Sequence, residues 1–519
     1  MANGELIFRP AYVQAGRGPH LLEWAYATDE SWDAFRCNIA ATKEGITISD
    51  AGGRKRFGIN VRWNVEGFGY IYITADNRGD FYALPPSGNV ELNLNYELAA
   101  SRVARNRRRL DAHRNSGWAP TRELEGYVDI AEGYLADAGR AKESLEACGA
   151  AAQKSLTYAM WASEMIELEK AAFDIVRRGR RKDFFTGCDA RGYFQMDVEL
   201  FLERFTGLFD YATITHYLIS GVFEDFEQEE GKLQFDLRDA LLRQLKARKF
   251  VVEGRPLWWS YKTTTPDWLR HKTYDGVRSY VEKHVRAVVS HYGDQMYAWE
   301  VVNEFHDWAN ECRLTPDQII EVTRLVCDVT HDVNPRVKRL INNCAPFAEY
   351  VQLGKMTDLD ATYPQRTPFQ FLKQLVDAGV QFDLTGVQMY FPYRDLADTF
   401  LLMEKFSTLG KPVQMTEVGA PSGPTPDSIA SGKLDITQEP YAWHRPWDEE
   451  LQADWMEGMY TLAYSKPWIE AINWYDFVDP FSWIPTGGFL RSPKGEKRAI
   501  YDRLLALQKR WNELPASRK

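Results

Sequence analysis

Two short apolar segments, far apart in the chain, each end in a glutamate. Residues 297–304 read YAWEVVNE and residues 413–417 read VQMTE, so Glu304 and Glu417 follow runs typical of buried strands. One protonated and one ionised carboxyl group can act together as a general acid and a nucleophile. We therefore take Glu304 and Glu417 as a candidate catalytic pair, provided that the fold brings the two strand ends together.

The reaction that suits such a pair is hydrolysis of a glycosidic bond with retention of configuration, which uses two carboxyl groups about 5–5.5 Å apart. A single glutamate after a strand is more often a helix cap or an ion-pair partner, and we interpret Glu300 as structural. Asn303 favours the catalytic interpretation of Glu304, because its amide can hydrogen-bond a sugar 2-hydroxyl in the transition state. Partial burial and a neighbouring negative charge would keep the acid protonated near neutral pH.

The strands that carry these residues belong to a repeating pattern of strand and helix after residue 183. Eight strand candidates end near Cys188, Thr213, Leu257, Val302, Ile341, Gln388, Met415 and Trp474. Helical periodicity between them is clearest over residues 274–291, 316–332, 396–409 and 449–464. This count predicts a (β/α)8 barrel rather than a doubly wound sheet, since no glycine-rich nucleotide loop follows the first strand. Strands four and seven face each other across a barrel, which would bring Glu304 and Glu417 to one mouth.

The chain before the barrel divides into two further parts. Residues 1–97 contain short alternating runs that end in turn residues, which is typical of an all-β sandwich and similar in size to carbohydrate-binding modules. Its Trp24, Trp32 and Trp63 form either a sugar platform or, as we prefer, the core of this small domain. Residues 98–182 have helical spacing and predict a structural bridge docked on the barrel of residues 183–519. In this bridge we interpret the basic run 105–109 as a solvated helix face rather than an anion site.

Composition and charge argue against several classes of function. The net charge of −10 argues against a nucleic-acid partner, and the lack of any apolar run of about 18 residues argues against a membrane span. The six cysteines form no Cys-x-x-Cys pair and the nine histidines form no His-x-x-x-His pair, so we expect neither a metal nor any other cofactor. The first residues show no signal peptide, which leaves a cytoplasmic enzyme or a secreted one without its leader. The oligomeric state is not predicted.

Taken together, the motifs from residue 183 to residue 511 resemble those of the family-ten glycoside hydrolases, the endo-β-1,4-xylanases. Segment 299–304 is similar to the family's acid/base segment, and segment 415–417 is similar to its nucleophile segment. Further similar segments are 229–232 followed by Phe235, 340–343, 383–388, Trp474 with Asp479 and 482–483, and 497–501. The resemblance implies that Glu304 is the acid/base, that Glu417 is the nucleophile, and that Gln388 contacts the catalytic region. It also implies that Trp474 and Trp483 cover the bound sugar.

Several positions depart from the family pattern. The family's third-strand segment carries two histidines, and the corresponding residues in the sequence GRPLWWS are Arg255 and Ser260. Tyr390 stands where the family has a histidine after the sixth-strand glutamine. Residues 214–221, ITHYLISG, lack the Glu-Asn pair and the lysine with which the family grips a second glycone sugar. The departures make β-glycoside chemistry a safer prediction than xylan specificity.

Two of the replacements have a physical interpretation. Tyr390 can donate its hydroxyl to the carboxylate of Glu417, which would hold that group ionised and correctly aimed. The Arg255 guanidinium has two possible roles. It either binds an acidic sugar substituent, such as a uronic acid, or, as we prefer, pairs with Glu253 or a catalytic carboxylate.

Two adjacent tryptophans follow the third strand. Aromatic residues make up 13% of the chain, which suits either large cores or the stacking of flat sugar rings. Neighbouring residues of a strand point to opposite sides, so Trp258 and Trp259 cannot both line a cleft. By register with the family, Trp259 lies in the cleft and Trp258 belongs to the packing.

The sequence thus predicts a retaining glycoside hydrolase that cleaves β-glycosidic bonds in a plant polysaccharide or oligosaccharide, in the manner of an endo-β-1,4-xylanase. The predicted catalytic residues are Glu304 and Glu417, and the predicted substrate-binding residues are Asn303, Gln388, Tyr390, Arg255, Trp259, Trp474 and Trp483. Two alternatives stay open. One is an exo-acting or oligosaccharide-specific β-glycosidase, and the other is a non-catalytic carbohydrate-binding protein built on a barrel.

Overall fold

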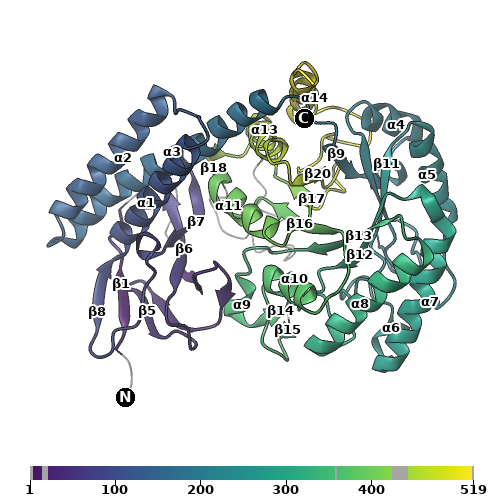
Figure 1. Ribbon diagram of the computed structural model, residues 1–519, viewed down its shortest axis with the longest axis horizontal. Coiled ribbons are helices and arrows are strands. Elements are labelled where there is room, and N and C mark those ends of the chain that lie inside the picture. Colours follow the sequence, from purple (N-terminus) through teal and green to yellow (C-terminus); the bar gives the residue numbers. More distant parts are fainter. Residues whose placement is uncertain (1–3, 14–20, 222, 357–358, 424–441, 517–519) are drawn as a thin grey trace.

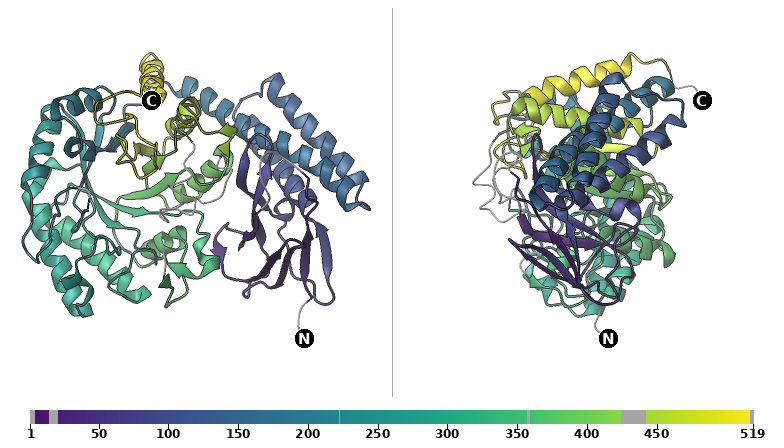
Figure 2. Two further views of the ribbon diagram at one scale, coloured as in Figure 1. Left: turned by 180° about the vertical axis from the view of Figure 1, so that it is seen from behind. Right: turned by 90° about the vertical axis from the view of Figure 1, so that its left-hand side faces the viewer.

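The computed structural model describes residues 4–13, 21–221, 223–356, 359–423 and 442–516. Three parts follow one another along the chain: two β-sheets, a layer of helices, and a (β/α)8 barrel (Figure 1). Figure 2 shows the helices, in blue, lying against the N-terminal sheets, in purple. The predicted fold class is confirmed.

The N-terminal strands form two four-stranded sheets that share one apolar core. The strand orders are β4-β5-β1-β8 and β3-β2-β6-β7. The strands are β1 (Leu6–Arg9), β2 (Leu21–Thr28), β3 (Ala34–Phe35), β4 (Asn38–Thr42), β5 (Gly45–Asp50), β6 (Gly58–Val65), β7 (Gly69–Ala75) and β8 (Val90–Asn93). Trp63 is fully buried in the core, as predicted, and its indole N–H donates to Gln153 at 2.8 Å. Trp32 lies under the guanidinium of Arg105, and the side chain of Trp24 lies outside the described residues.

Three helices connect the sheets to the barrel: α1 (Leu94–Arg114), α2 (Arg122–Arg140) and α3 (Leu145–Arg178). Helix α1 begins before the expected boundary at residue 98, because Asn93 caps it by accepting a hydrogen bond from the N–H of Tyr96. Helix α3 ends at Gly179, whose φ of 81° is a conformation that glycine adopts without strain. Both ends follow local capping chemistry.

Eight parallel strands close into a barrel in the order β9-β10-β11-β12-β13-β16-β17-β20. They are β9 (Phe185–Asp189), β10 (Tyr211–Thr215), β11 (Val251–Arg255), β12 (Ala298–Asn303), β13 (Lys338–Asn343), β16 (Leu384–Tyr390), β17 (Val413–Gly419) and β20 (Ile469–Trp474). Each predicted strand is present within a few residues of its expected end. The register places Asn303 beside Asn342, and Gln388 beside Glu417.

Helices between these strands cover the barrel. They are α4 (Val198–Thr206), α5 (Asp236–Ala247), α6 (Asp267–Arg270), α7 (Tyr274–Tyr292), α8 (Pro316–Val333), α9 (Tyr350–Leu353), α10 (Pro368–Asp377), α11 (Leu396–Ser407), α13 (Glu449–Ser465) and α14 (Ala499–Asn512). Short elements are η1 (Asn77–Gly79), η2 (Ala190–Phe194), η3 (Gly293–Gln295), β14 (Lys355–Met356), β15 (Leu359–Asp360), β18 (Ala442–Trp443) and β19 (Arg445–Pro446). Helix α8 starts with a capping box between Thr315 and Gln318 and with proline at its first position.

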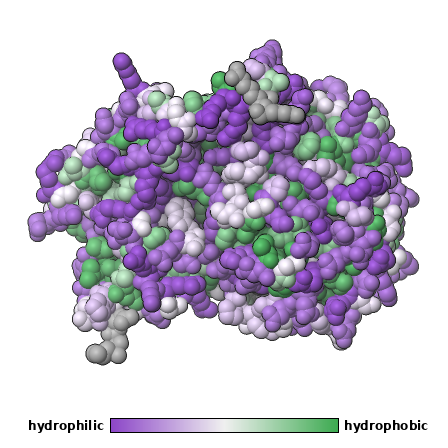
Figure 3. Space-filling model, viewed as in Figure 1, coloured by the Kyte–Doolittle hydropathy of each residue, from purple (hydrophilic) through white to green (hydrophobic). Residues whose placement is uncertain are grey.

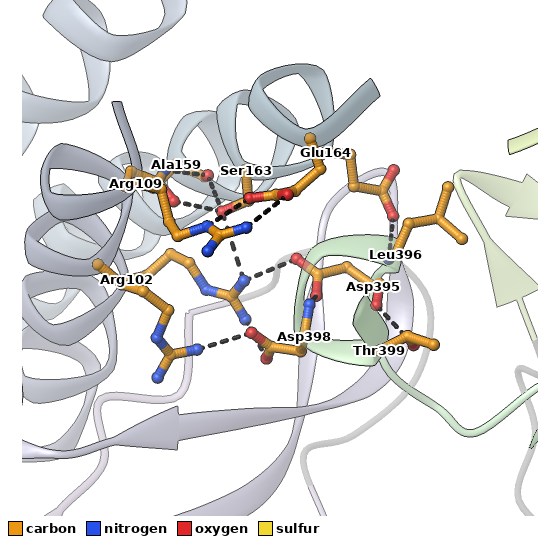
Figure 4. A network of polar contacts seen from close by, with 12 residues as sticks. Arg102, Arg109, Ala159, Ser163, Glu164, Asp395, Leu396, Asp398 and Thr399 are labelled. Carbon is orange, nitrogen blue, oxygen red and sulfur yellow. Dashed lines mark hydrogen bonds and ion pairs between the residues drawn. The ribbon is translucent and has the colours of Figure 1, made fainter. Parts of the chain in front are cut away.

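Buried ion pairs dock α1 on the barrel (Figure 4). Arg102 reaches Asp395 at 2.7 Å and Asp398 at 2.6 Å, at the start of α11, and Arg105 reaches Asp398 at 2.7 Å. Arg109 pairs with carboxylates of α3 and α11. The expectation that the run 105–109 is a solvated face is therefore wrong at Arg105 and Arg109, because the barrel supplies anionic partners that the local sequence does not show.

The sheet containing β2 and β7 also contacts the loop after β16. The N–H of Tyr72 donates to the carbonyl of Tyr393 at 2.7 Å. Arg394 donates to the hydroxyl of Tyr26, and its guanidinium lies 4.1 Å from the centre of the Tyr72 ring. The N-terminal sheets are thus packed against a loop that begins at the mouth of the barrel.

Hydrophilic residues cover most of the face seen in Figure 3, and apolar residues form scattered patches on it. Among the described residues, no helix has both the length and the apolar character needed to span a bilayer.

Candidate active site

Glu304 and Glu417 lie at the same end of the barrel, on its fourth and seventh strands. Glu304 directly follows β12, and its φ of 53° turns the chain out of the strand direction. Glu417 lies near the end of β17. Only 9% of Glu304 and 5% of Glu417 are exposed. Both carboxyl groups are therefore held by protein groups rather than by bulk water.

Three donors hold the carboxylate of Glu417. Arg255 forms an ion pair with Oε1, and the side-chain amide of Asn342 donates to the same oxygen at 3.1 Å. The hydroxyl of Tyr390 donates to Oε2, as the sequence predicts. Donation to both oxygens fixes the orientation of the carboxylate.

Two donors hold Glu304, one at each oxygen of its carboxyl group. The indole N–H of Trp259 donates to Oε2 at 3.1 Å, and the amide of Gln388 donates to Oε1 at 2.8 Å. Burial and then the negative charge of Glu417 raise the pKa of Glu304 to about 7, against the weaker opposing effect of its donors. At neutral pH Glu304 is therefore poised to give up or to accept a proton.

A chain of side-chain amides connects the two carboxyl groups. Asn303 Oδ1 accepts a hydrogen bond from Gln388, at 3.4 Å, and another from Asn342, at 3.1 Å. Gln388 in turn contacts Glu304, and Asn342 contacts Glu417. The two glutamates thus converge on one region of the barrel mouth, as the opposition of strands four and seven predicts. Both bonds to Asn303 use its oxygen, so its amide nitrogen is directed elsewhere.

Arg255 lies at the end of β11 with only 1% of its surface exposed. Its guanidinium pairs with Glu417, and its Nε lies 3.3 Å from Oε2 of Glu300. Two roles were considered for Arg255. The structure favours pairing with Glu417, a candidate catalytic carboxylate, over binding an acidic sugar substituent, because Glu417 and Glu300 already contact the guanidinium.

The aromatic residues divide between the site and the core. Trp258 is buried in the packing and Trp259 is half-buried. The ring of Trp259 lies 4.9 Å from that of Tyr217. Trp483 is half-buried and its ring lies 6.5 Å from that of Tyr390. Partly exposed rings thus lie near both carboxyl groups.

The prediction that Trp474 covers the bound sugar is wrong. Its side chain is fully buried, it packs between Trp455 and Phe489, and its indole N–H donates to the carbonyl of Gly487 at 2.8 Å. The next residue, Tyr475, faces the site instead, with its ring 5.3 Å from the guanidinium of Arg255. Adjacent residues at the end of a strand point to opposite sides, so a shift of one position exchanges core and cleft.

The structure adds residues that the sequence analysis missed. Asn342 donates to Glu417, to Asn303 and, at 3.0 Å, to Glu300. Glu300 was expected to be merely structural, yet it lies against Arg255 in the same network. The ladder between β12 and β13 shifts register between Glu300 and Val302, which lets Glu300 and Asn303 contact the same amide although they are three positions apart.

Within the described ranges, no group of three or more His, Cys, Asp or Glu side chains is arranged to hold a metal ion.

Comparisons with known proteins find xylanases among the proteins similar to this chain. The chain is 23% identical over 304 residues to endo-1,4-β-xylanase B of Thermotoga neapolitana, covering 56% of this chain and 72% of that protein. It is 29% identical over 176 residues to a β-1,4-xylanase of Dictyoglomus thermophilum, covering 32% of this chain and 45% of that protein. Over 126 residues it is 27% identical to endo-1,4-β-xylanase 2 of Claviceps purpurea, covering 23% of this chain and 38% of that protein. The alignments thus span less than half of the latter two proteins.

Among solved structures, native xylanase 10B of Thermotoga maritima aligns with a TM-score of 0.48 and 17% identity, covering 67% of this chain and 99% of that one. The model of the family described as "Glycosyl hydrolase family 10" matches residues 222–507, which is more than half of the chain. The chain therefore belongs to glycosyl hydrolase family 10.

Proposed function

We propose that the chain cleaves β-glycosidic bonds with retention of configuration, in the manner of an endo-β-1,4-xylanase. The observation that carries the proposal is the contrast between two connected carboxyl groups. Glu304 has a pKa of about 7, raised by burial and by the charge of Glu417, whereas Glu417 is paired with Arg255 and bound by Tyr390. Such a contrast suits one group to act as acid and the other as nucleophile.

The proposed reaction consists of two displacements. An oxygen of Glu417 bonds to the anomeric carbon, the bond from that carbon to the leaving oxygen breaks, and Glu304 gives its proton to the leaving oxygen. Glu304, now ionised, then takes a proton from water as the water oxygen bonds to the anomeric carbon and the bond to Glu417 breaks. The two inversions restore the original configuration.

Other predicted residues have supporting roles in this proposal. The amide nitrogen of Asn303, which takes no part in the bonds to Gln388 and Asn342, suits a hydrogen bond to the sugar 2-hydroxyl, and Gln388 holds Glu304 in place. Trp259 and Trp483 offer partly exposed ring faces for a pyranose. A xylan-type substrate is supported by the relatives, which are xylanases.

The test is the variant Glu417→Ala, assayed with an aryl β-xylobioside. We expect turnover to be lost, because no nucleophile remains, and sodium azide to restore product formation with inverted configuration at the anomeric carbon. A variant that keeps activity close to that of the unmodified protein would contradict the assignment. The control is Glu253→Gln, which alters a buried carboxyl of the same barrel that is bound by Tyr211.

One observation favours a second candidate, an exo-acting or oligosaccharide-specific β-glycosidase. The stretch 214–221 places Tyr217, a largely buried residue, between Trp259 and Tyr475, and its hydroxyl lies 3.1 Å from that of Tyr475. These rings take up space where the family resemblance implies polar contacts to a second glycone sugar. Chain lengths of the first products from an end-labelled xylohexaose separate the two: internal cleavage supports the endo-enzyme, and release of terminal units alone supports the exo-enzyme.

A further inference from the structure

A third buried carboxyl group, that of Glu300, lies beside the proposed catalytic pair and has no part in the two displacements. Its Oε2 accepts a hydrogen bond from Asn342 at 3.0 Å and lies 3.3 Å from Nε of Arg255. Its Oε1 is buried and has no hydrogen-bond partner among the described residues. A buried carboxyl with an unsatisfied oxygen costs free energy, so stability alone does not account for Glu300.

Arg255 contacts both carboxyl groups and is itself enclosed. Its Nη2 pairs with Glu417, its Nε faces Glu300, and the ring of Tyr475 lies 5.3 Å from the guanidinium. An arginine stays charged when it is buried, and a buried charge without a partner is strongly unfavourable. The guanidinium therefore needs an anion beside it at every stage of the reaction.

The proposed reaction removes one of its partners. When Glu417 bonds to the anomeric carbon, its carboxylate becomes a neutral ester. The negative charge then resides on Glu304, whose proton has left with the leaving oxygen. Glu304 is bound by Trp259 and Gln388 rather than by Arg255, so the guanidinium loses its direct contact with the reacting charge.

We propose that Glu300 is a positioning residue that serves as the counter-anion of Arg255 while Glu417 is esterified. The guanidinium would pair with Glu417 before the first displacement, with Glu300 in the covalent intermediate, and again with Glu417 after hydrolysis. This inference rests on the retaining mechanism proposed above.

The charges that face Glu300 favour this exchange. Burial raises the pKa of Glu300 well above its usual value, Arg255 opposes this, and the charges of Glu417, Glu253 and Glu304 raise it further, with Glu417 the strongest of the three. Transfer of the negative charge from Glu417 to Glu304 therefore lowers the pKa of Glu300. This shifts the carboxyl toward its ionised form, with its proton passing to solvent, at the stage when Arg255 needs a partner.

The test compares Glu300→Gln with Glu253→Gln, using 2,4-dinitrophenyl β-xylobioside. Both variants remove a buried carboxyl of the barrel, but Glu253 is bound by Tyr211 and not by the Arg255 guanidinium. For such a good leaving group, kcat/KM reports formation of the intermediate and kcat reports its hydrolysis. We expect Glu300→Gln to lower kcat/KM at least about tenfold and to leave kcat unchanged or raised, whereas Glu253→Gln changes neither by more than about twofold.

Two further variants distinguish this role from a merely structural one. Glu300→Asp keeps the negative charge and should restore most of the lost kcat/KM. In an Arg255→Met background, Glu300→Gln should cause no further loss, because the carboxyl acts through the guanidinium. Equal effects of Glu300→Gln and Glu253→Gln, or a kcat that falls together with kcat/KM, would overturn the inference. A wild-type protein that turns the substrate over without a burst of dinitrophenolate would instead overturn the retaining mechanism itself.

Discussion

Glu304 and Glu417 are chemically identical side chains, and only their surroundings make them different. Glu304 is buried, near a negative charge, and bound by two uncharged donors. Glu417 is bound by a guanidinium, an amide and a hydroxyl. The first environment raises the pKa of Glu304 to about 7, and the second holds the Glu417 carboxylate in one orientation, which suits the proposed roles of acid and nucleophile.

This difference predicts how activity changes with pH. Because the acid must carry its proton, kcat/KM should fall as the pH rises through about 7, the pKa of Glu304. Glu304→Ala should lose this alkaline limb when it is assayed with a dinitrophenyl glycoside, which needs no acid. The raised pKa also means that the folded state binds this proton more tightly than the unfolded chain, so its contribution to stability is lost as the pH rises through about 7. Circular dichroism across the same range separates inactivation from unfolding. An alkaline limb that persists in Glu304→Ala would assign it to another group.

For single residues, the sequence predicts the positions of the polar and charged side chains of the site better than the directions in which the aromatic side chains point. Both glutamates and the bond from Tyr390 to Glu417 follow from residue type and position, since strand ends fix where such side chains can lie. Trp474 was wrongly placed in the cleft, because its direction depends on a single position of register at the end of β20. Glu300 was missed because the register shift in β12 is not visible as a sequence pattern.

Strand β16 shows how one element serves both carboxyl groups. Gln388 and Tyr390 are two positions apart and lie on the same side of the strand. Gln388 donates to Glu304 and Tyr390 donates to Glu417. The spacing of the two donors along β16 therefore contributes to the spacing of the two carboxyl groups across the barrel.

Removal of one donor should affect the chemical step more than binding. Tyr390→Phe keeps the ring and loses the hydroxyl that aims Glu417, so we expect kcat to fall about tenfold to hundredfold with KM changed by less than about threefold. Tyr363→Phe, at an exposed tyrosine in the loop before α10, is the matched control and should behave like the unmodified protein. A larger change in KM than in kcat would assign Tyr390 to substrate binding instead.

The elements themselves were predictable because their local signals agree. Each barrel strand is a short apolar run, and several of the helices that follow begin with a clear cap, such as Thr315 before α8, although α5 and α14 have no side-chain cap. The start of α1 at Leu94 was placed too late, because an asparagine cap in a polar stretch carries little apolar periodicity. The partners of α1 were not predictable, since Asp395 and Asp398 lie nearly three hundred positions further along the chain.

Across the whole molecule, the three parts are joined by buried charges rather than by a flexible linker. Arg102 and Arg105 of α1 bind the first turn of α11 (Figure 4), and the N-terminal sheet contacts the loop after Tyr390 through Tyr393 and Arg394. Trp63 lies in the core of the N-terminal part.

The buried ion pairs of α1 predict a large loss of stability from a change far from the site. Arg102→Met takes the guanidinium away from buried Asp395 and leaves buried Asp398 with Arg105 alone, so it should lower the free energy of unfolding by about 3–5 kcal/mol. Arg107→Met, on the same helix but with an exposed ion pair to Glu132, should change it by less than about 1 kcal/mol. Urea unfolding followed by tryptophan fluorescence measures both. Similar values for the two variants would show that the α1–α11 contact does not hold the parts together.

The most direct test of the central claim is to identify the residue that becomes covalently bound to the sugar. The protein is incubated with 2,4-dinitrophenyl 2-deoxy-2-fluoro-β-xylobioside, digested, and analysed by mass spectrometry. We predict one labelled peptide, with the sugar on Glu417, and faster labelling of the wild type than of Tyr390→Phe. A label on any other residue, or steady hydrolysis of the unfluorinated analogue with no labelled peptide, would contradict the account.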